Sequence, residues 1–193
     1  LTVSTEHAIY EPSDPGEYVA ITGTVRTSQG TPVSGATISI LVTKPNGVTL
    51  DPFPLTATSY DGEFDKTFRL PSQAMEGTYT VSANYGGSTA TTTFSVLKPV
   101  LTLSTDEPSY APSETVTISG TLKYPEGTPI SGRYISIQVT NPNTLNILLV
   151  TTSTNSVGGF SRSFNLASDA MAGSYTVTAS VSEVTATATF EVT

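Results

Sequence analysis

Three acidic residues around one glycine turn, Asp61, Glu63 and Asp65, could offer carboxylate oxygens to a calcium ion. Alternate residues of a strand point to the same side, so Glu63 and Asp65 would face one way. The second half of the chain carries no acidic residue at the corresponding places. Asp-Gly is also a common hairpin turn. We therefore predict a turn and no metal site, and keep calcium at these three residues as the weaker alternative.

Residues for nucleophilic or acid–base catalysis are scarce. The sequence holds one histidine, His7, whose counterpart in the second half is Glu107, and it holds no cysteine. No Ser-His-Asp or Cys-His set is visible, and nothing indicates the cleft that a pair of glycosidase carboxylates needs. Glu17 and its counterpart Glu114 fit turns better than ligand sets. We expect no enzyme, no catalytic residue and no cofactor.

Covalent modification has few candidate residues. Lys66 is the best-placed lysine for an intramolecular isopeptide bond, but its counterpart is Arg162, whose guanidinium stays protonated and cannot replace the amine nucleophile. The shared positive charge is better explained as a solvated strand position. The sequence contains no Asn-x-Ser/Thr sequon, so N-glycosylation is not predicted, while O-glycosylation of threonine and serine stays open.

One aromatic residue, Phe53, stands between Pro52 and Pro54 in a segment that the second half lacks. Prolines are found at strand edges and in loops, which would leave this ring available as a contact residue. A ring that fills the core beneath the loop is the alternative, and it is the more common one.

The composition excludes some partners. Charged residues make up 12% of the chain, and the formal net charge is −8. Nucleic-acid binding is not expected, because it needs clustered lysine and arginine and the eight basic residues here are scattered. Threonine (35 residues) and serine (24 residues) are abundant instead, and threonine suits the solvent face of a strand.

No segment is apolar enough to cross a membrane as a helix. Tyr18–Ile21 and Ile147–Val150 are among the longest apolar runs, far short of the ~20 residues required. No signal peptide is visible, since a strand pattern starts at Leu1. We expect a mature protein or an excised segment.

The chain repeats itself with a period of nearly half its length. The matching segments are mostly strands and turns, and they include Leu1–Thr5 with Leu101–Thr105, Val19–Val25 with Val116–Leu122, Gly30–Gly35 with Gly127–Gly132, and Gly77–Val81 with Gly173–Val177. Such a period is too long for a solenoid repeat and fits whole domains. Because the copies meet at Leu97–Val100, we predict domains 1–97 and 98–193.

Each half alternates apolar and polar residues with a period of two. Ile38, Ile40 and Val42 alternate with polar or exposed positions, and turn signals such as Pro45–Gly47 and Asp61-Gly62 separate the runs. This pattern is typical of antiparallel sheets with one buried face. We predict an all-β fold of two tandem immunoglobulin-like antiparallel β-sandwiches with about seven strands each.

Several motifs in each half carry a family resemblance. They are Tyr-x-Pro, a strand that ends in Gly-Thr-Val/Leu, Gly-Thr-Pro-Val/Ile-Ser-Gly, Gly-x-Phe and Gly-x-Tyr-Thr-Val-x-Ala. In these motifs the chain resembles the immunoglobulin-like domains of archaeal and bacterial surface proteins, and also the second macroglobulin-type domain of the α2-macroglobulin group. The reactive thioester of that group needs a cysteine, which is absent here, so the resemblance does not imply that activity.

The repeat and the resemblance together suggest an extracellular, cell-surface module. One hypothesis is a structural unit of a surface layer, stalk or filament, whose partners are further copies or neighbouring surface domains. Added strands would then pair with the terminal strands, which makes Leu1, Val3, Phe190 and Val192 interaction candidates. The other hypothesis is an adhesin or ligand-binding accessory module.

Overall fold

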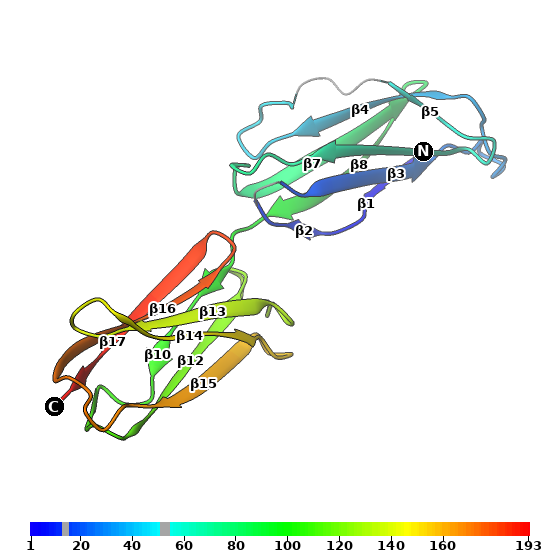
Figure 1. Cartoon of the computed structure of the whole chain (residues 1–193). Helices are drawn as coiled ribbons and strands as arrows, with labels where there is room; N and C mark the ends of the chain where they lie inside the picture. Colours follow the sequence, from blue (N-terminus) through cyan, green and yellow to red (C-terminus); the bar gives the residue numbers. More distant parts are fainter. Residues whose placement is uncertain (13–15, 51–54) are drawn as a thin grey trace. The chain divides into compact units, whose positions relative to one another are not determined.

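The computed structural model describes residues 1–12, 16–50 and 55–193. The chain divides into two compact units, Leu1–Leu97 and Lys98–Thr193. Each unit is a two-layer sandwich of β-sheets (Figure 1). Within the described ranges, no helix is long and apolar enough to span a membrane. All the regular elements within these described ranges are β-strands, so the all-β prediction is confirmed.

The first unit packs a three-stranded sheet, in the order β1-β3-β6, against a five-stranded sheet, in the order β2-β8-β7-β4-β5. Its strands are β1 (Thr2–Thr5), β2 (Ile9–Tyr10), β3 (Tyr18–Thr24), β4 (Thr37–Thr43), β5 (Thr56–Ala57), β6 (Glu63–Arg69), β7 (Gly77–Tyr85) and β8 (Ser88–Val96).

The second unit repeats this plan. One sheet has the order β10-β12-β15, with β9 also pairing with β12, and the other has the order β11-β17-β16-β13-β14. Its strands are β9 (Val100–Leu101), β10 (Ser104–Thr105), β11 (Ser109–Tyr110), β12 (Thr115–Lys123), β13 (Tyr134–Thr140), β14 (Asn146–Ser153), β15 (Gly159–Asn165), β16 (Gly173–Val181) and β17 (Val184–Val192).

The first strand of each unit changes sheet part-way. In the first unit β1 pairs with β3, and the chain then crosses so that β2 pairs with β8. If these pieces are counted as one crossing strand, each unit has the predicted seven strands. The sheets are antiparallel apart from this element, because β2 and β11 run parallel to β8 and β17. A strand that reaches the second sheet by crossing, and not by a hairpin, keeps its direction.

The period of two in the sequence explains the core. Along β4, Ile38, Ile40 and Val42 are buried while their neighbours Thr37, Ser39 and Leu41 are exposed, as the pattern predicts. A core of this kind is repeated in each unit, with about the same residue types at matching positions.

Stacked aromatic rings mark the centre of each core. In the first unit the ring of Phe94 stacks on Tyr79, with centroids 5.0 Å apart, and meets Tyr10 edge-on at 5.2 Å. In the second unit Phe190 stacks on Tyr175 and meets Tyr110 in the same way. These rings join the end of the crossing strand to both long strands of the larger sheet.

Candidate binding site

The acidic residues of the glycine turn lie on the surface. Asp61, Glu63 and Asp65 are all exposed. Glu63 and Asp65 share the outer face of β6 and line a polar hollow with threonine and serine hydroxyls of β1 and β3, which Asp61 does not join. Among the described residues, no three His, Cys, Asp or Glu side chains gather closely enough to hold a metal ion.

The threonine and serine residues beside this hollow bond to one another across strands. The hydroxyls of Thr2 and Thr24 are 2.9 Å apart, and those of Ser4 and Thr22 are 3.0 Å apart. The second unit repeats the first of these pairs, with 2.8 Å between the Thr102 and Thr121 hydroxyls. The abundant hydroxyls therefore hold the first strand of each unit to the sheet.

His7 takes part in the crossing of the first strand. Its backbone N–H donates to the Tyr10 hydroxyl at 3.1 Å, and its exposed imidazole lies 3.8 Å from the Glu6 carboxylate. The backbone N–H of Glu107, its counterpart, donates to Tyr110 in the same way, at 2.9 Å. The shared element is thus the tyrosine hydroxyl and not the histidine.

The second unit adds a carboxylate to this crossing. The Tyr110 hydroxyl donates to Asp106 Oδ1 at 2.6 Å, and the Thr117 backbone N–H donates to the same oxygen at 2.8 Å. These two hydrogen bonds hold the pKa of Asp106 below its ordinary value, and the bond from Tyr110 has the larger effect. Burial raises the pKa of the Tyr110 hydroxyl, and the hydrogen bond to Asp106 raises it further.

Glu17 and Glu114 have the turn role expected of them. Glu17 accepts a hydrogen bond from the Glu11 backbone N–H at 3.1 Å, and Glu114 accepts one from the Ala111 backbone N–H at 2.6 Å. Phe53, the predicted contact residue, belongs to the segment 51–54, which lies outside the described residues.

The four terminal-strand candidates differ in burial. Leu1 and Val3 are half-buried and pack against the first core. Phe190 and Val192 are 1% and 2% exposed, so their side chains cannot form a contact surface in the folded unit. The expectation for these two is corrected, because they sit on the inward face of β17. The end of β17 is also already paired, through Glu191 and Val192, with β11.

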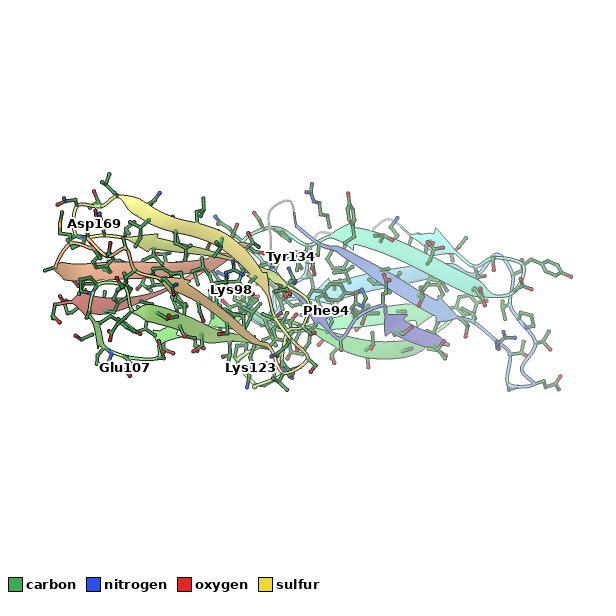
Figure 2. All side chains as sticks on the ribbon, turned by 60° about the horizontal axis from the view of Figure 1, so that its bottom comes forward. Phe94, Lys98, Glu107, Lys123, Tyr134 and Asp169 are labelled. Atoms are coloured by element: carbon green, nitrogen blue, oxygen red, sulfur yellow. The ribbon has the colours of Figure 1, made fainter. Side chains whose placement is uncertain are left out.

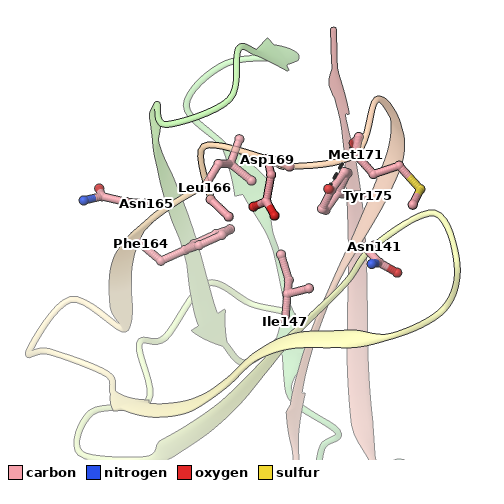
Figure 3. A pocket seen from close by; sticks show the side chains of 10 residues that line it. Asn141, Ile147, Phe164, Asn165, Leu166, Asp169, Met171 and Tyr175 are labelled. Carbon is pink, nitrogen blue, oxygen red and sulfur yellow. Dashed lines mark hydrogen bonds between the residues drawn. The ribbon is translucent and has the colours of Figure 1, made fainter.

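The second unit has an apolar notch at the open side of its sandwich, where the sheet edges β14 and β15 approach each other. Its volume is about 320 Å³. The apolar part of its lining comes from β14, from β15 and the turn after it, and from β16, as Figure 3 shows; it consists of Ile147, Phe164, Leu166, Ala167, Ala170, Met171 and Tyr175.

Two local features shape the notch. A β-bulge in the pairing of β13 with β14 places Val139 opposite Leu148 and Thr140 opposite Asn146, so Ile147 has no direct partner on β13. Ile147 instead lines the notch. On the other side, the Tyr175 hydroxyl donates to the Met171 backbone carbonyl at 3.1 Å, which fixes the turn that carries Met171 (Figure 3).

The polar residues of the notch are Asn141, Asn165 and Asp169. Asp169 is the one charged residue in the lining, and its carboxylate points toward the space between Phe164 and Ile147 (Figure 3). No hydrogen bond or ion pair to this exposed carboxylate is found among residues 98–193, all of which the structure describes. The arrangement can hold an aliphatic side chain next to a cation.

The sequence also matches a known family twice. Residues 1–96 and residues 101–192 each match the family described as MG2 domain. The chain is a tandem pair of MG2 domains. The resemblance to macroglobulin-type domains is thereby confirmed.

Three known proteins are similar to this MG2 pair in sequence or in fold. It is 32% identical over 147 residues to "Alpha-2-macroglobulin" of Ralstonia nicotianae, an alignment that covers 72% of this chain and 9% of that protein. Its fold is similar to that of the Escherichia coli adhesin FdeC (TM-score 0.53, 18% identity, 99% of this chain and 63% of that one). Trypsin-activated alpha-2-macroglobulin of Escherichia coli gives a TM-score of 0.43 at 19% identity, over 98% of this chain and 15% of that one.

The first MG2 domain differs from the second in charge at the notch positions. Most of the apolar residues that line the notch have an identical residue at the corresponding place in the first domain. These residues include Phe68, Leu70, Met75 and Tyr79. The polar lining residues are not matched, because Lys44, Arg69 and Gln73 stand where the second domain has Asn141, Asn165 and Asp169. Two cations thus replace two amides, and an amide replaces the carboxylate.

Sequence reasoning missed the notch, although two signals were present. Ile147–Val150 is among the longest apolar runs of the chain, and Ala167–Ala172 corresponds to a turn whose residue types differ from those of the first domain. The two segments are distant in sequence and meet only because β14 and β15 are the edges of opposite sheets. Two structural positions, Thr58 and Thr154, are buried threonines that carried no sequence signal beyond being matched.

Proposed function

We propose that this MG2 pair is a non-catalytic, extracellular module of a larger surface protein, in which it acts as a structural spacer or subunit. The chain spans 9% of the length of its curated relative, which supports a role as a part of something longer. The matched domain family is a structural one, and this supports a role without catalysis.

The observation that carries the proposal is the role of the residues that the two domains share. Gly23 and Gly120 each lie under a phenylalanine ring from the neighbouring strand of the same sheet. Tyr10 and Tyr110 each bind a backbone N–H at the sheet crossing. Each shared feature maintains the sandwich, so the common purpose of the two copies is the scaffold itself.

The finer form of the proposal is assembly into a surface layer, stalk or filament through sheet edges. In the first domain β1, which contains the interaction candidate Val3, is an edge strand. Edge strands present unpaired N–H and C=O groups to which a further strand can bind. Electron microscopy of the purified protein, over a range of protein and calcium concentrations, tests this form. Regular filaments or sheets support it, and monodisperse monomers under all conditions contradict it.

A second candidate function is that of an adhesin or ligand-binding accessory module, and the notch beside β14 favours it. A solved structure of similar fold is described as an adhesin. A glycan array tests whether the ligand is a sugar, with Phe53→Ala as the variant of the contact residue that the sequence predicts. An array without hits, together with a variant that behaves like the parent, removes sugar binding from this candidate.

A further inference from the structure

Two features of the second MG2 domain meet at one place. The strand β14 ends its sheet, so one side of its backbone has no strand partner in that sheet. The apolar notch opens beside the same strand and includes Ile147 from it. An open backbone edge next to a side-chain pocket is the arrangement by which a sheet binds an extended peptide as an added strand.

The edge at β14 lacks the usual protection of natural edge strands. Short length, charged residues and proline keep most sheet edges from pairing. In this chain β5 is short, β6 carries Lys66 and Arg69, and β15 carries Arg162. The first domain also has Pro52 and Pro54 in the sequence before β5.

By contrast, β14 and the residue before it contain neither charge nor proline. Large aliphatic side chains also stand exposed along this edge. Leu145 is 63% exposed and Leu149 is 69% exposed, while Leu148 and Val150 pack inward against the core. Exposed aliphatic residues beside an open edge indicate an interaction surface.

The notch combines an apolar lining with one charge. Asp169 is its one charged residue, and the lysines do not compensate it. Within the second domain, Asp169 and Glu107 lie at one end of the sandwich, and Lys98 and Lys123 lie at the other (Figure 2). A cation brought into the notch would therefore meet the exposed carboxylate of Asp169, and this attraction would be modest and sensitive to salt.

We propose that β14 takes up an extended segment of a partner protein as an added strand, with an aliphatic side chain in the notch and a lysine or arginine beside Asp169. A second copy of this chain fits less well, because pairing between two β14 strands would bring no cation to Asp169 from residues 145–153. This inference goes beyond the spacer role and does not depend on it.

The test uses the whole chain and two synthetic peptides of alternating valine and threonine, one with a central lysine and one with a central glutamate. Backbone amide shifts of isotope-labelled protein are followed by NMR during titration. We expect the lysine peptide to shift the amides of β14 and of the turn that holds Asp169, and to slow hydrogen exchange along β14. The binding should weaken as salt is added, because an exposed ion pair is screened.

Three variants and one internal control make the test specific. Asp169→Gln, which introduces the residue of the first domain, should weaken lysine-peptide binding by about threefold or more and leave glutamate-peptide binding unchanged or improved. Asp169→Lys should reverse the preference between the peptides. Glu126→Gln removes one negative charge from an exposed hairpin turn and should change neither. The first MG2 domain serves as an internal control, since its matched positions carry Lys44 and Arg69.

The proposal is overturned if the lysine peptide shifts no β14 amide, if both peptides bind equally well, or if Asp169→Gln has the same effect as Glu126→Gln. Shifts confined to the notch, without slower exchange along β14, would overturn strand addition. Self-association through the same β14 amides in the absence of peptide would assign the edge to a second copy and overturn the choice of partner.

Discussion

The ring of Phe64 lies over the backbone of Gly23, its direct partner in the pairing of β6 with β3. A β-carbon added to Gly23 would stand 2.3 Å from Cζ of the ring and 2.2 Å from the Thr2 carbonyl oxygen. The second domain repeats the relationship with Phe160 and Gly120. The glycine of Gly-Thr-Val/Leu and the phenylalanine of Gly-x-Phe are therefore one packing unit, which seats the ring against the sheet and lets the first strand approach.

Alanine at this glycine should destabilise the domain that contains it. For Gly120→Ala we expect a loss of about 1–3 kcal/mol in the free energy of unfolding, because the new methyl group overlaps both Phe160 and the Thr102 carbonyl. Urea denaturation measures the loss. Gly159→Ala, where the nearest atom is Asn155 Nδ2 at 3.3 Å, is the matched control and should cost clearly less. Equal losses would show that the close packing at Gly120 is not the cause.

Valine at Thr58 should also destabilise the first domain. The buried Thr58 hydroxyl donates to the Val33 carbonyl at 2.6 Å and accepts from the Ala36 N–H at 2.8 Å. Valine has nearly the same shape but leaves both backbone groups without this partner, which costs about 1–3 kcal/mol. Urea denaturation and hydrogen exchange at Ala36 measure the effect. Thr37→Val on the exposed face of β4 is the control, and a similar loss there would contradict the explanation.

Removing the Tyr110 hydroxyl should make the second domain less stable in a way that depends on pH. The folded pKa of Asp106 lies below its ordinary value, so the stabilisation is complete above about pH 4 and is lost as the pH falls through the folded pKa. Tyr110→Phe should therefore lower the free energy of unfolding more at neutral pH than at strongly acidic pH. An NMR titration of the Asp106 carboxyl should show its pKa rising in the variant. A loss of stability that is the same at all pH values would contradict this coupling.

Phe190→Ala distinguishes a core residue from an interaction residue. Because the ring is buried and stacked on Tyr175, its removal should cost about 3–5 kcal/mol in the free energy of unfolding. Leu149→Ala on the exposed edge should change stability by no more than about 0.5 kcal/mol. Thermal unfolding of both variants makes the comparison. A stable Phe190→Ala protein would contradict the position of this residue in the core.

The alternation of apolar residues was enough to predict the sandwich and its buried face. Ile38, Ile40 and Val42 could be assigned to the core because side chains alternate across any strand, wherever that strand lies. Alternation also places Phe190 and Val192 on the apolar face of the last strand. They were interaction candidates for a different reason, namely that a terminal strand could pair with a neighbouring molecule. Only the pairing of β17 with β16 and β11 showed that its ends are enclosed.

The sequence by itself determined the all-β class, the duplication and the residues that each domain devotes to packing, because these depend on local alternation and on turn residues. The tertiary structure decided which strands are sheet edges, how the first strand changes sheet, and that Asp169 and Ile147 line one notch. Those properties arise from contacts between segments far apart in the chain. No local pattern encodes them, since they depend on where the sheets end in space.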